Sequence, residues 1–420
     1  MPRGGGRGDL PLRRRGILNP PLSRRDAVEA VIPFAVAPSS EEVDLADAGQ
    51  RILATPINAD RDHPPFNRST MDGYAVRAAE VAPERVFPVV GSVSAGTAPP
   101  PSVDPGSCVA IATGAALPPD LDAVIEHERS NRENPVRFEL PSIESGRNIH
   151  PRGIDRKAGA PVLPEAIRLG PAEIGIAASN GHHRIQVRRR PTVALISTGD
   201  ELVDIRETPG PWQLRDSNRP MLAAAINDIG GEVRSQARAI DTLEDTADQL
   251  REAMSQCDLV VTIGGVSAGE RDHVPAAWEM LGAKPLINRA AIQPGRPIRA
   301  WQADQVTAIA LPGNPVSALV CLHLFARPWL RAGLGLDPLA DWEVGELERP
   351  ARTNPHRTAL RPCHQTTRDS PGTTRVSVAA WHGSGDLPHL AETIGIVELD
   401  PEAGPEIPAG TPCPLLRWSP

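Results

Sequence analysis

The chain has 420 residues, enough for several domains with large buried cores. Its formal net charge of −8, from 52 acidic and 44 basic residues, gives no general attraction to nucleic acid or to anionic membranes, so we expect neither as a partner. Five cysteines lie far apart without metal-ligand spacing, and no stretch reaches the roughly 18 apolar residues of a membrane span. We therefore expect a reducing, cytoplasmic compartment.

The segments before residue 190 predict three kinds of structure. The N-terminal MPRGGGRGDLPLRRR carries five arginines in fifteen residues without an apolar run, which favours a solvated, disordered tail over an arm that binds nucleic acid. Short alternating segments such as VFPVVGSVSAG, separated by Pro-rich turns, indicate a β-rich domain between about residues 41 and 148. Helical spacing over 155–181 predicts a connection to the next domain.

Strands and helices alternate between about residues 190 and 333. Apolar runs predict strands over 192–197, 258–265 and 306–313, and helical spacing predicts helices over 221–231, 245–254 and 273–282. Such alternation implies right-handed crossovers and a doubly wound, mostly parallel sheet, hence an α/β domain. The β-like runs between about residues 336 and 420 then indicate a small barrel or sandwich.

Three polar, glycine-rich corners follow predicted strands: STGDE at 197–201, TIGGVSAG at 262–269 and LPGNP at 311–315. We expect them to converge at the carboxyl edge of the sheet, where open α/β sheets bind ligands. Each motif alone is weak, because such turns are common and GGVSAG lacks the lysine of a phosphate-binding P-loop. Their convergence predicts a ligand site.

The segment ALPGNPVSALV predicts a stiff helix entry. Pro315 suits the first helical turn, Asn314 is expected to cap it through its side-chain oxygen, and free amides around Ser317 and Ala318 would attract an anion. A well-capped core helix without any ligand is the alternative at this point.

Acidic residues cluster in the same turns: Asp200, Glu201, Asp216 and Asp272, with Asp72 far upstream. Carboxylates beside an anion site would repel a phosphate unless a cation lies between them, which points to Mg²⁺. Singly, each could instead be a cap or a solvated turn residue, and the residues after Asp216 could equally cap a helix.

Arg296 lies between glycine and proline in QPGRP, a stiff turn that suits an oxyanion, although a solvated surface arginine is the plain alternative. The histidines show no metal-ligand spacing such as HExxH, and we treat most of them as surface or packing residues.

Eight stretches in order, from about residue 64 to 320, resemble the molybdopterin molybdenumtransferase family, which also includes the E domain of gephyrin. They are PPFNRSTMDGYAVRA, ATGAALPPDLDAVIEHE, NIHPRGIDR, STGDEL, DSNRPML, GGVSAGERDHV, QPGRPIRA and LPGNPVSAL. Weaker similarity covers the rest of the chain.

The resemblance implies an enzyme of molybdenum cofactor biosynthesis that inserts molybdate into adenylated molybdopterin and releases AMP with Mg²⁺. It further implies a homodimer whose site is shared between subunits, and a transient contact with the molybdopterin adenylyltransferase. We expect four domains: a discontinuous helical linking domain (1–40 with 149–188), a β-rich inserted domain (41–148), an α/β molybdopterin-binding domain (189–334) and a barrel-like C-terminal domain (335–420).

The motifs and the resemblance together give candidate site residues. Catalysis is expected from Asp72, Glu201 and Asp272, and metal binding from Glu201, Asp241 and Asp272. Substrate contacts are expected from Thr113, Asp155, Asp200, Ser217, Asn218, Gly264, Gly265, Ser267, Gln293, Pro294, Gly295, Arg296, Pro312, Gly313, Asn314, Pro315, Ser317, Arg361 and Ser384.

Departures from the family pattern leave other functions open. The chain has Gln293 and Arg296 where the family usually has lysines, and it lacks the histidine usual after Ser384. A catalytically weakened paralogue that binds molybdopterin or serves as a scaffold is therefore the alternative. A general nucleotide-binding α/β enzyme is a third hypothesis, against which the missing P-loop lysine counts.

Overall fold

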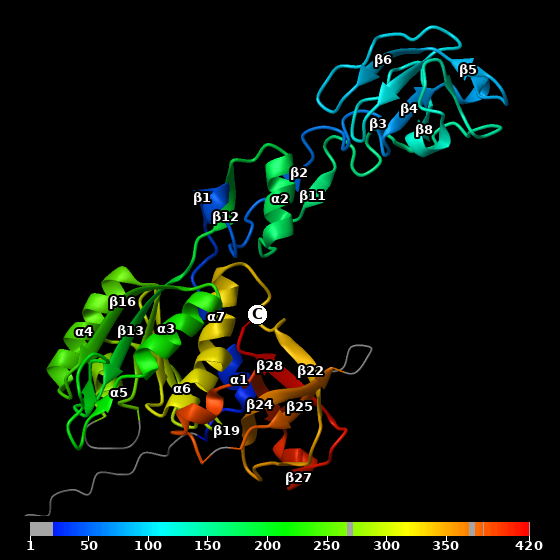
Figure 1. Cartoon of the computed structure of the whole chain (residues 1–420). Helices are drawn as coiled ribbons and strands as arrows, with labels where there is room; N and C mark the ends of the chain where they lie inside the picture. Colours follow the sequence, from blue (N-terminus) through cyan, green and yellow to red (C-terminus); the bar gives the residue numbers. More distant parts are fainter. Residues whose placement is uncertain (1–19, 267–271, 369–373, 381, 420) are drawn as a thin grey trace, which may run out of the picture. The chain divides into compact units, whose positions relative to one another are not determined.

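The computed structural model describes residues 20–266, 272–368, 374–380 and 382–419, and the chain divides into two units. The inserted unit is Ser40–Val187, and the other unit contains the chain before and after it. Figure 1 colours both along the sequence. In the part of the chain described, no helix combines the length and the apolar character needed to cross a membrane.

The inserted unit is built around a four-stranded sheet, in the order β6-β7-β4-β8. Along its central strand Tyr74 and Val76 pack into one apolar cluster and Ala75 into another, so both faces of the sheet are buried. Its elements are β4 (Gly73–Val76), β6 (Val89–Val93), β7 (Cys108–Ile111), β8 (Ala123–Glu126), the pair β5 (Val86–Phe87) and β9 (Val136–Arg137), and the 3₁₀ turns η3 (Ala78–Glu80) and η4 (His127–Arg129).

The remainder of this unit consists of short antiparallel pairs and one α-helix. The prediction of helix through 155–181 is wrong except over α2, because Pro161 and the turns at Gly159 and Ala166, which both have positive φ, break the helical spacing. The elements are β1 (Ser40–Asp44) with β12 (Arg184–Arg188), β2 (Ile57–Asn58) with β11 (Pro161–Leu163), β3 (Arg68–Ser69) with β10 (Ile149–His150), η2 (Leu45–Asp47) and α2 (Pro171–Ser179).

The second unit contains a six-stranded sheet in the order β16-β13-β17-β21-β20-β18. The first four strands are parallel, and β20 and β18 add an antiparallel edge, so the sheet is mixed. The strands are β13 (Thr192–Thr198), β16 (Glu232–Ala239), β17 (Leu259–Ile263), β18 (Lys284–Ile287), β20 (Arg299–Ala303) and β21 (Val306–Leu311).

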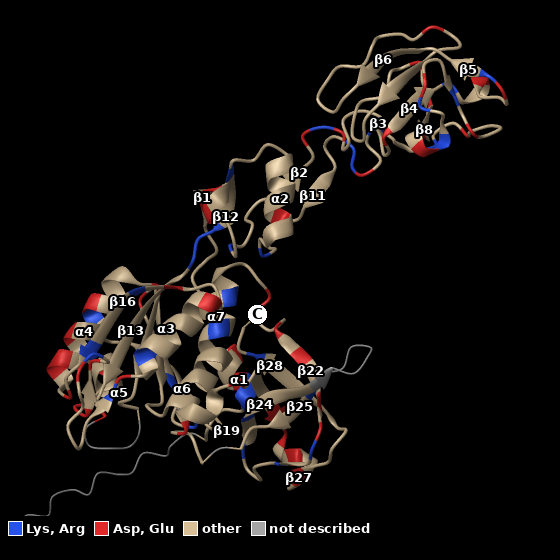
Figure 2. Ribbon diagram, in the orientation of Figure 1, with Lys and Arg blue, Asp and Glu red and all other residues tan. Residues whose placement is uncertain are grey.

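Helices cover both faces of this sheet (Figure 1). Val193 and Leu195 of β13 pack with α3, α6 and α7, whereas Ala194 and Ile196 pack with α4 and α5. The helices are α3 (Asn218–Asp228), α4 (Leu243–Gln256), α5 (Val274–Met280), α6 (Pro315–Cys321), the π-helical turn η5 (Leu322–Ala326) and α7 (Arg327–Gly333). The outer helix α4 displays acidic and basic residues (Figure 2), and Thr246 and Leu250 are among its buried residues.

Residues 20–39 belong to the same unit. Helix α1 (Arg24–Glu29) is capped by Ser23, whose hydroxyl accepts from the amide of Asp26 at 3.1 Å, and η1 (Ile32–Phe34) follows. Ala27 and Val28 lie in the core beneath the α/β sheet. The described part of 1–40 therefore packs here rather than joining 149–188, a correction to our domain assignment that follows from its apolar residues having a larger core to enter.

The C-terminal region forms a closed barrel. Its strands follow the order β24-β25-β22-β28-β26, and pairing of β26 with β24 closes the ring. One further strand, β19 (Ile292–Gln293), joins β24 in parallel from far upstream. The other elements are β22 (Trp342–Leu347), β24 (Thr358–Arg368), β25 (Thr374–Val378), β26 (Gly395–Leu399), β28 (Pro412–Arg417), the pair β23 (Ala351–Arg352) and β27 (Glu406–Ile407), η6 (Leu387–Leu390) and η7 (Pro401–Ala403).

Candidate functional site

A cleft of about 760 Å³ opens where three strands of the α/β sheet end. The registers pair Ser197 with Ile263 and Ile263 with Leu311, so the turns after β13, β17 and β21 must meet. Its lining residues are Thr198, Gly199, Glu201, Leu202, Leu214, Arg215, Asp216, Ser217, Asn218, Asp241, Ile263, Gly264, Gly265, Val266, Asp272, Pro297, Pro312, Gly313, Asn314, Pro315, Gly385 and Leu387. The predicted convergence of the three corners is confirmed.

Two glycines allow the turns to pack this closely. Gly264 has φ +89° and Gly265 has φ +65°, and a Cβ built on either would come within 3.0 Å of Thr198 atoms. The Gly264 amide donates to the carbonyl of Leu311 at 3.0 Å, which links two of the corners. The GG pair is therefore required by the backbone, and it leaves polar backbone near the ligand space.

Helix α3 begins at the cleft, three residues earlier than predicted. One amide of its first turn is capped by Asp216, whose Oδ1 accepts from the Arg219 amide at 3.1 Å and whose Oδ2 pairs with Arg219 Nε at 2.9 Å. Asn218 Nδ2 donates to the carbonyl of Gly313 at 2.6 Å, while its buried Oδ1 has no hydrogen-bond partner among the described residues. Asn218 thus joins α3 to the LPGNP corner and offers a polar atom at the cleft.

The entry of α6 differs from our expectation. Asn314 makes no side-chain cap; its Nδ2 donates to Ser384 Oγ at 2.8 Å instead. The Val316 amide donates to the Ser384 carbonyl at 3.0 Å, and the Ala318 amide is bonded inside the helix to the Asn314 carbonyl at 2.9 Å. Ser317 is buried. The prediction of a free amide is therefore wrong at Ala318, because an intrahelical hydrogen bond already uses that amide.

The wall of the cleft is acidic. Four carboxylates line it, from Glu201, Asp216, Asp241 and Asp272, whereas Arg215 is its single cationic residue within the described chain. Asp216 is paired with Arg219, and the four carboxylates together give the cleft a negative potential.

The predicted metal ligands Glu201, Asp241 and Asp272 thus share one cleft, but their oxygens do not form a ready-made cluster within 4.8 Å. This donor set fits Mg²⁺, since that ion usually binds one or two carboxylates and completes its shell with water and substrate phosphates.

The residues expected to bind the oxyanion form a second group, beside the barrel. Gln293 Oε1 accepts from Asn354 Nδ2 at 2.7 Å and from the Arg361 guanidinium at 3.1 Å. Burial, with a contribution from Arg357, lowers the pKa of Arg361. Arg296 is exposed in the turn after Gln293, and the next residue, Pro297, lines the cleft. The structure therefore brings the two candidate residues Gln293 and Arg361 into contact.

Within the inserted unit, two predicted site residues contact each other. Asp72 Oδ1 accepts from the Thr113 amide at 2.7 Å and from the Thr113 hydroxyl at 3.0 Å. These two bonds hold the pKa of Asp72 below its usual range. Asp155 lies 3.0 Å from His150 Nε2.

Other candidates have different fates. Ser267 lies outside the described residues, and Asp200 is exposed but does not line the cleft. We missed Arg215, which adjoins the stretch DSNRPML, and the cleft residues Gly385 and Leu387, which follow the candidate Ser384. Asn354 carried no local signal at all, because its contact with Gln293 depends on strand pairing across 61 residues.

Comparison with known proteins agrees with this architecture. The family described as "MoeA N-terminal region (domain I and II)" matches residues 22–181, and the "Probable molybdopterin binding domain" matches residues 194–332, which contain most of the cleft. A crystal structure of the molybdopterin biosynthesis moea protein from Pyrococcus horikosii superimposes with a TM-score of 0.79 at 29% identity, covering 96% of this chain and 100% of that one.

Several relatives carry the name molybdopterin molybdenumtransferase, and two of them illustrate the match. That of Nostoc sp. (strain PCC 7120) is 36% identical over 371 residues, covering 86% of this chain and 85% of the relative. That of Bacillus subtilis (strain 168) is 33% identical over 324 residues, covering 75% of each. The chain belongs to the molybdopterin molybdenumtransferase family, and it is a transferase of molybdenum cofactor biosynthesis.

Proposed function

We propose that the chain inserts molybdate into adenylated molybdopterin and releases AMP in a Mg²⁺-dependent reaction. The acidic cleft at the strand ends carries this proposal. Its volume of about 760 Å³ suits a ligand of this size. Its carboxylates would repel a pyrophosphate-containing substrate, so productive binding requires a cation between the two.

The chain's own residues divide the work. Asn218 and the Gly264–Gly265 turn present polar atoms to the pterin and phosphates, while Pro312 and Pro315 stiffen the adjoining corner. Glu201, Asp241 and Asp272 would hold Mg²⁺, which supplies charge neutralisation to the pyrophosphate. Arg361 and Arg296 are proposed to orient molybdate.

We also propose a homodimer with a site shared between subunits, a transient contact with the molybdopterin adenylyltransferase, and a cytoplasmic location. The family resemblance supports the first two. The buried, unpaired state of all five cysteines supports a reducing compartment.

The test is molybdate-dependent AMP formation from adenylated molybdopterin. Asp272→Asn should lower AMP release by about 100-fold or more, because the variant loses a charge facing the pyrophosphate. Asp228→Asn, which removes an exposed carboxylate at the end of α3, is the matched control and should keep full activity. Equal AMP release by both variants would remove the metal assignment.

A pterin-binding scaffold is the second candidate, and the Gln293 contact favours it. A neutral amide replaces the usual lysine, and it occupies donors of Arg361 and Asn354. Tight binding of adenylated molybdopterin without molybdate-dependent AMP release would decide for the scaffold.

A further inference from the structure

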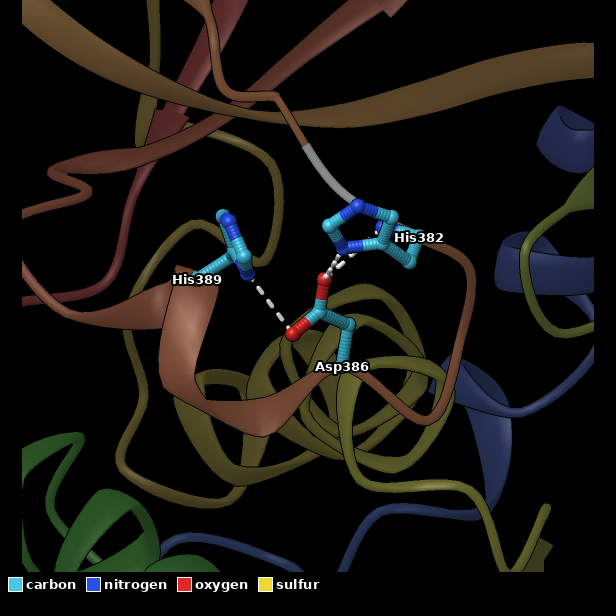
Figure 3. A group of neighbouring side chains, drawn as sticks. All are labelled: His382, Asp386 and His389. Carbon is cyan, nitrogen blue, oxygen red and sulfur yellow. Dashed lines mark hydrogen bonds and ion pairs between the residues drawn. The ribbon is translucent and has the colours of Figure 1, made fainter.

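A second cluster of side chains that could hold a metal ion lies in the connection between β25 and β26. His382 Nδ1 lies 3.1 Å from Asp386 Oδ2, and His389 Nδ1 lies 2.7 Å from Asp386 Oδ1. Figure 3 shows both rings directed at the one carboxylate. Neither the resemblance nor the proposed Mg²⁺ site uses these residues.

The local backbone creates this convergence. Gly383 has φ +126°, and the Asp386 amide donates to its carbonyl at 3.1 Å, so the chain reverses after His382. The His382 amide donates to Asp386 Oδ2 at 2.7 Å. The turn η6 then places His389 three residues beyond Asp386, on the other side of its carboxylate.

The donor atoms suit a transition-metal ion. In the described part of the chain this is the one trio of His, Cys, Asp or Glu whose ligand atoms all lie within 4.8 Å of one another. Zinc bonds of about 2.1 Å place ligand atoms of a tetrahedral site about 3.4 Å apart. The separation of 3.1 Å between His382 Nδ1 and Asp386 Oδ2 is close to this value, and the 2.7 Å between His389 Nδ1 and Asp386 Oδ1 must widen when the ion binds. A neutral imidazole that carries its proton on Nε2 leaves the Nδ1 lone pair for the metal.

The five cysteines offer weak competition for such an ion. All five cysteines are buried, and burial raises the pKa of each thiol, to about 11 even at Cys257 and Cys413. The thiols therefore stay protonated, whereas metals bind thiolates. The cluster is accessible, since the side chain of His382 is 88% exposed and that of His389 is 41% exposed.

We propose that His382, Asp386 and His389 bind one divalent transition-metal ion of the zinc class, with water completing the shell. The site is distinct from the Mg²⁺ site because imidazole nitrogens suit zinc, whereas magnesium prefers oxygen. Its ligands flank Gly385 and Leu387, which line the cleft, and Ser384, which bonds to Asn314. The ion therefore fixes one wall of the cleft.

The test is a direct titration of the full chain. Metal-stripped protein is titrated with Zn²⁺ against a chromophoric zinc chelator, with excess Mg²⁺ present to occupy the carboxylates of the cleft. We expect one equivalent to bind. His382→Ala should weaken binding by more than about 100-fold, because even outer-shell partners of a metal are worth 10- to 100-fold. His389→Ala should do the same.

The controls separate the site from adventitious binding. His183→Ala removes an exposed histidine of the inserted unit and should bind Zn²⁺ as the parent does. Reactivity of the thiols toward a thiol reagent should not change when Zn²⁺ is added. Co²⁺ should give a visible absorption band that His382→Ala abolishes. If no Zn²⁺ binds, or if the parent and His382→Ala bind it equally, the proposal is wrong and the trio is a hydrogen-bonded cluster without a metal.

Discussion

Replacing Gly295 by alanine should destabilise the α/β and barrel unit more than an ordinary glycine substitution would. Gly295 lies in the QPGRP turn with φ +105°, and a Cβ there would come within 2.3 Å of Cys321 Sγ and 3.0 Å of Ile292 Cδ1. Cys321 is fully buried in α6 and cannot withdraw into solvent.

Two costs add at this position. A positive φ costs an alanine about 1–3 kcal/mol, and overpacking a close-packed core costs about 1–3 kcal/mol more. We therefore expect Gly295→Ala to lower the free energy of unfolding by about 2–6 kcal/mol. Gly282→Ala is the matched control: its φ is +75° but a Cβ meets nothing within 4 Å, so it should cost about 1 kcal/mol.

A double-mutant cycle isolates the contact. Cys321→Ala removes the obstructing sulfur, so adding Gly295→Ala to that variant should cost at least about 1 kcal/mol less than adding it to the parent. All seven tryptophans lie in residues 188–420, so tryptophan fluorescence during denaturation reports on this unit alone. Additive effects of the two substitutions would refute the steric argument and leave only backbone strain.

Three further outcomes follow from other contacts. Gln293→Lys should tighten molybdate binding, because an ammonium replaces a neutral amide beside Arg361; an unchanged molybdate titration would show that this position does not face the oxyanion. Burial and Arg327 lower the pKa of His323 to about 3, below the ~6.5 of a histidine in an unfolded chain. The free energy of unfolding should therefore be unaffected by this group above about pH 6.5 and should fall as the pH drops toward 3. His323→Gln should flatten the dependence of Tm on pH. Asp258→Asn should lower the free energy of unfolding by about 1–3 kcal/mol. The Asp258 carboxylate accepts from Arg189 Nη1 and Nη2 at 3.0 and 3.2 Å and from the Thr192 amide at 2.7 Å. Unaltered denaturation by urea would contradict this.

Sequence patterns predicted β13, β17 and β21 because these three strands are buried on both faces and read as continuous apolar runs. The convergence of the three corners followed from topology alone, since parallel strands present their carboxyl ends at one edge. The roles of the individual residues there stay predictions.

Predictions of helix capping from local sequence failed where segments distant in the chain make contact. Asn314 has the right type and position for a helix cap, yet Ser384 bonds to its side chain and takes the Val316 amide. Likewise, Asp216 rather than Ser217 or Asn218 caps α3, a choice among neighbours that local propensity does not make. The His382–Asp386–His389 trio was missed because its spacing follows an irregular turn instead of a helix or strand.

Strand β19 limits where segments can be exchanged between this chain and a relative. Its two residues extend the barrel sheet by pairing with β24, from a point more than forty positions before the barrel's own first strand. Leu360, Ile396 and Leu416 of the barrel also share a core with the α/β helices. Chimeras that exchange segments with a relative should therefore cross over upstream of residue 292. A junction near 335 would pair β19 of one parent with β24 of the other.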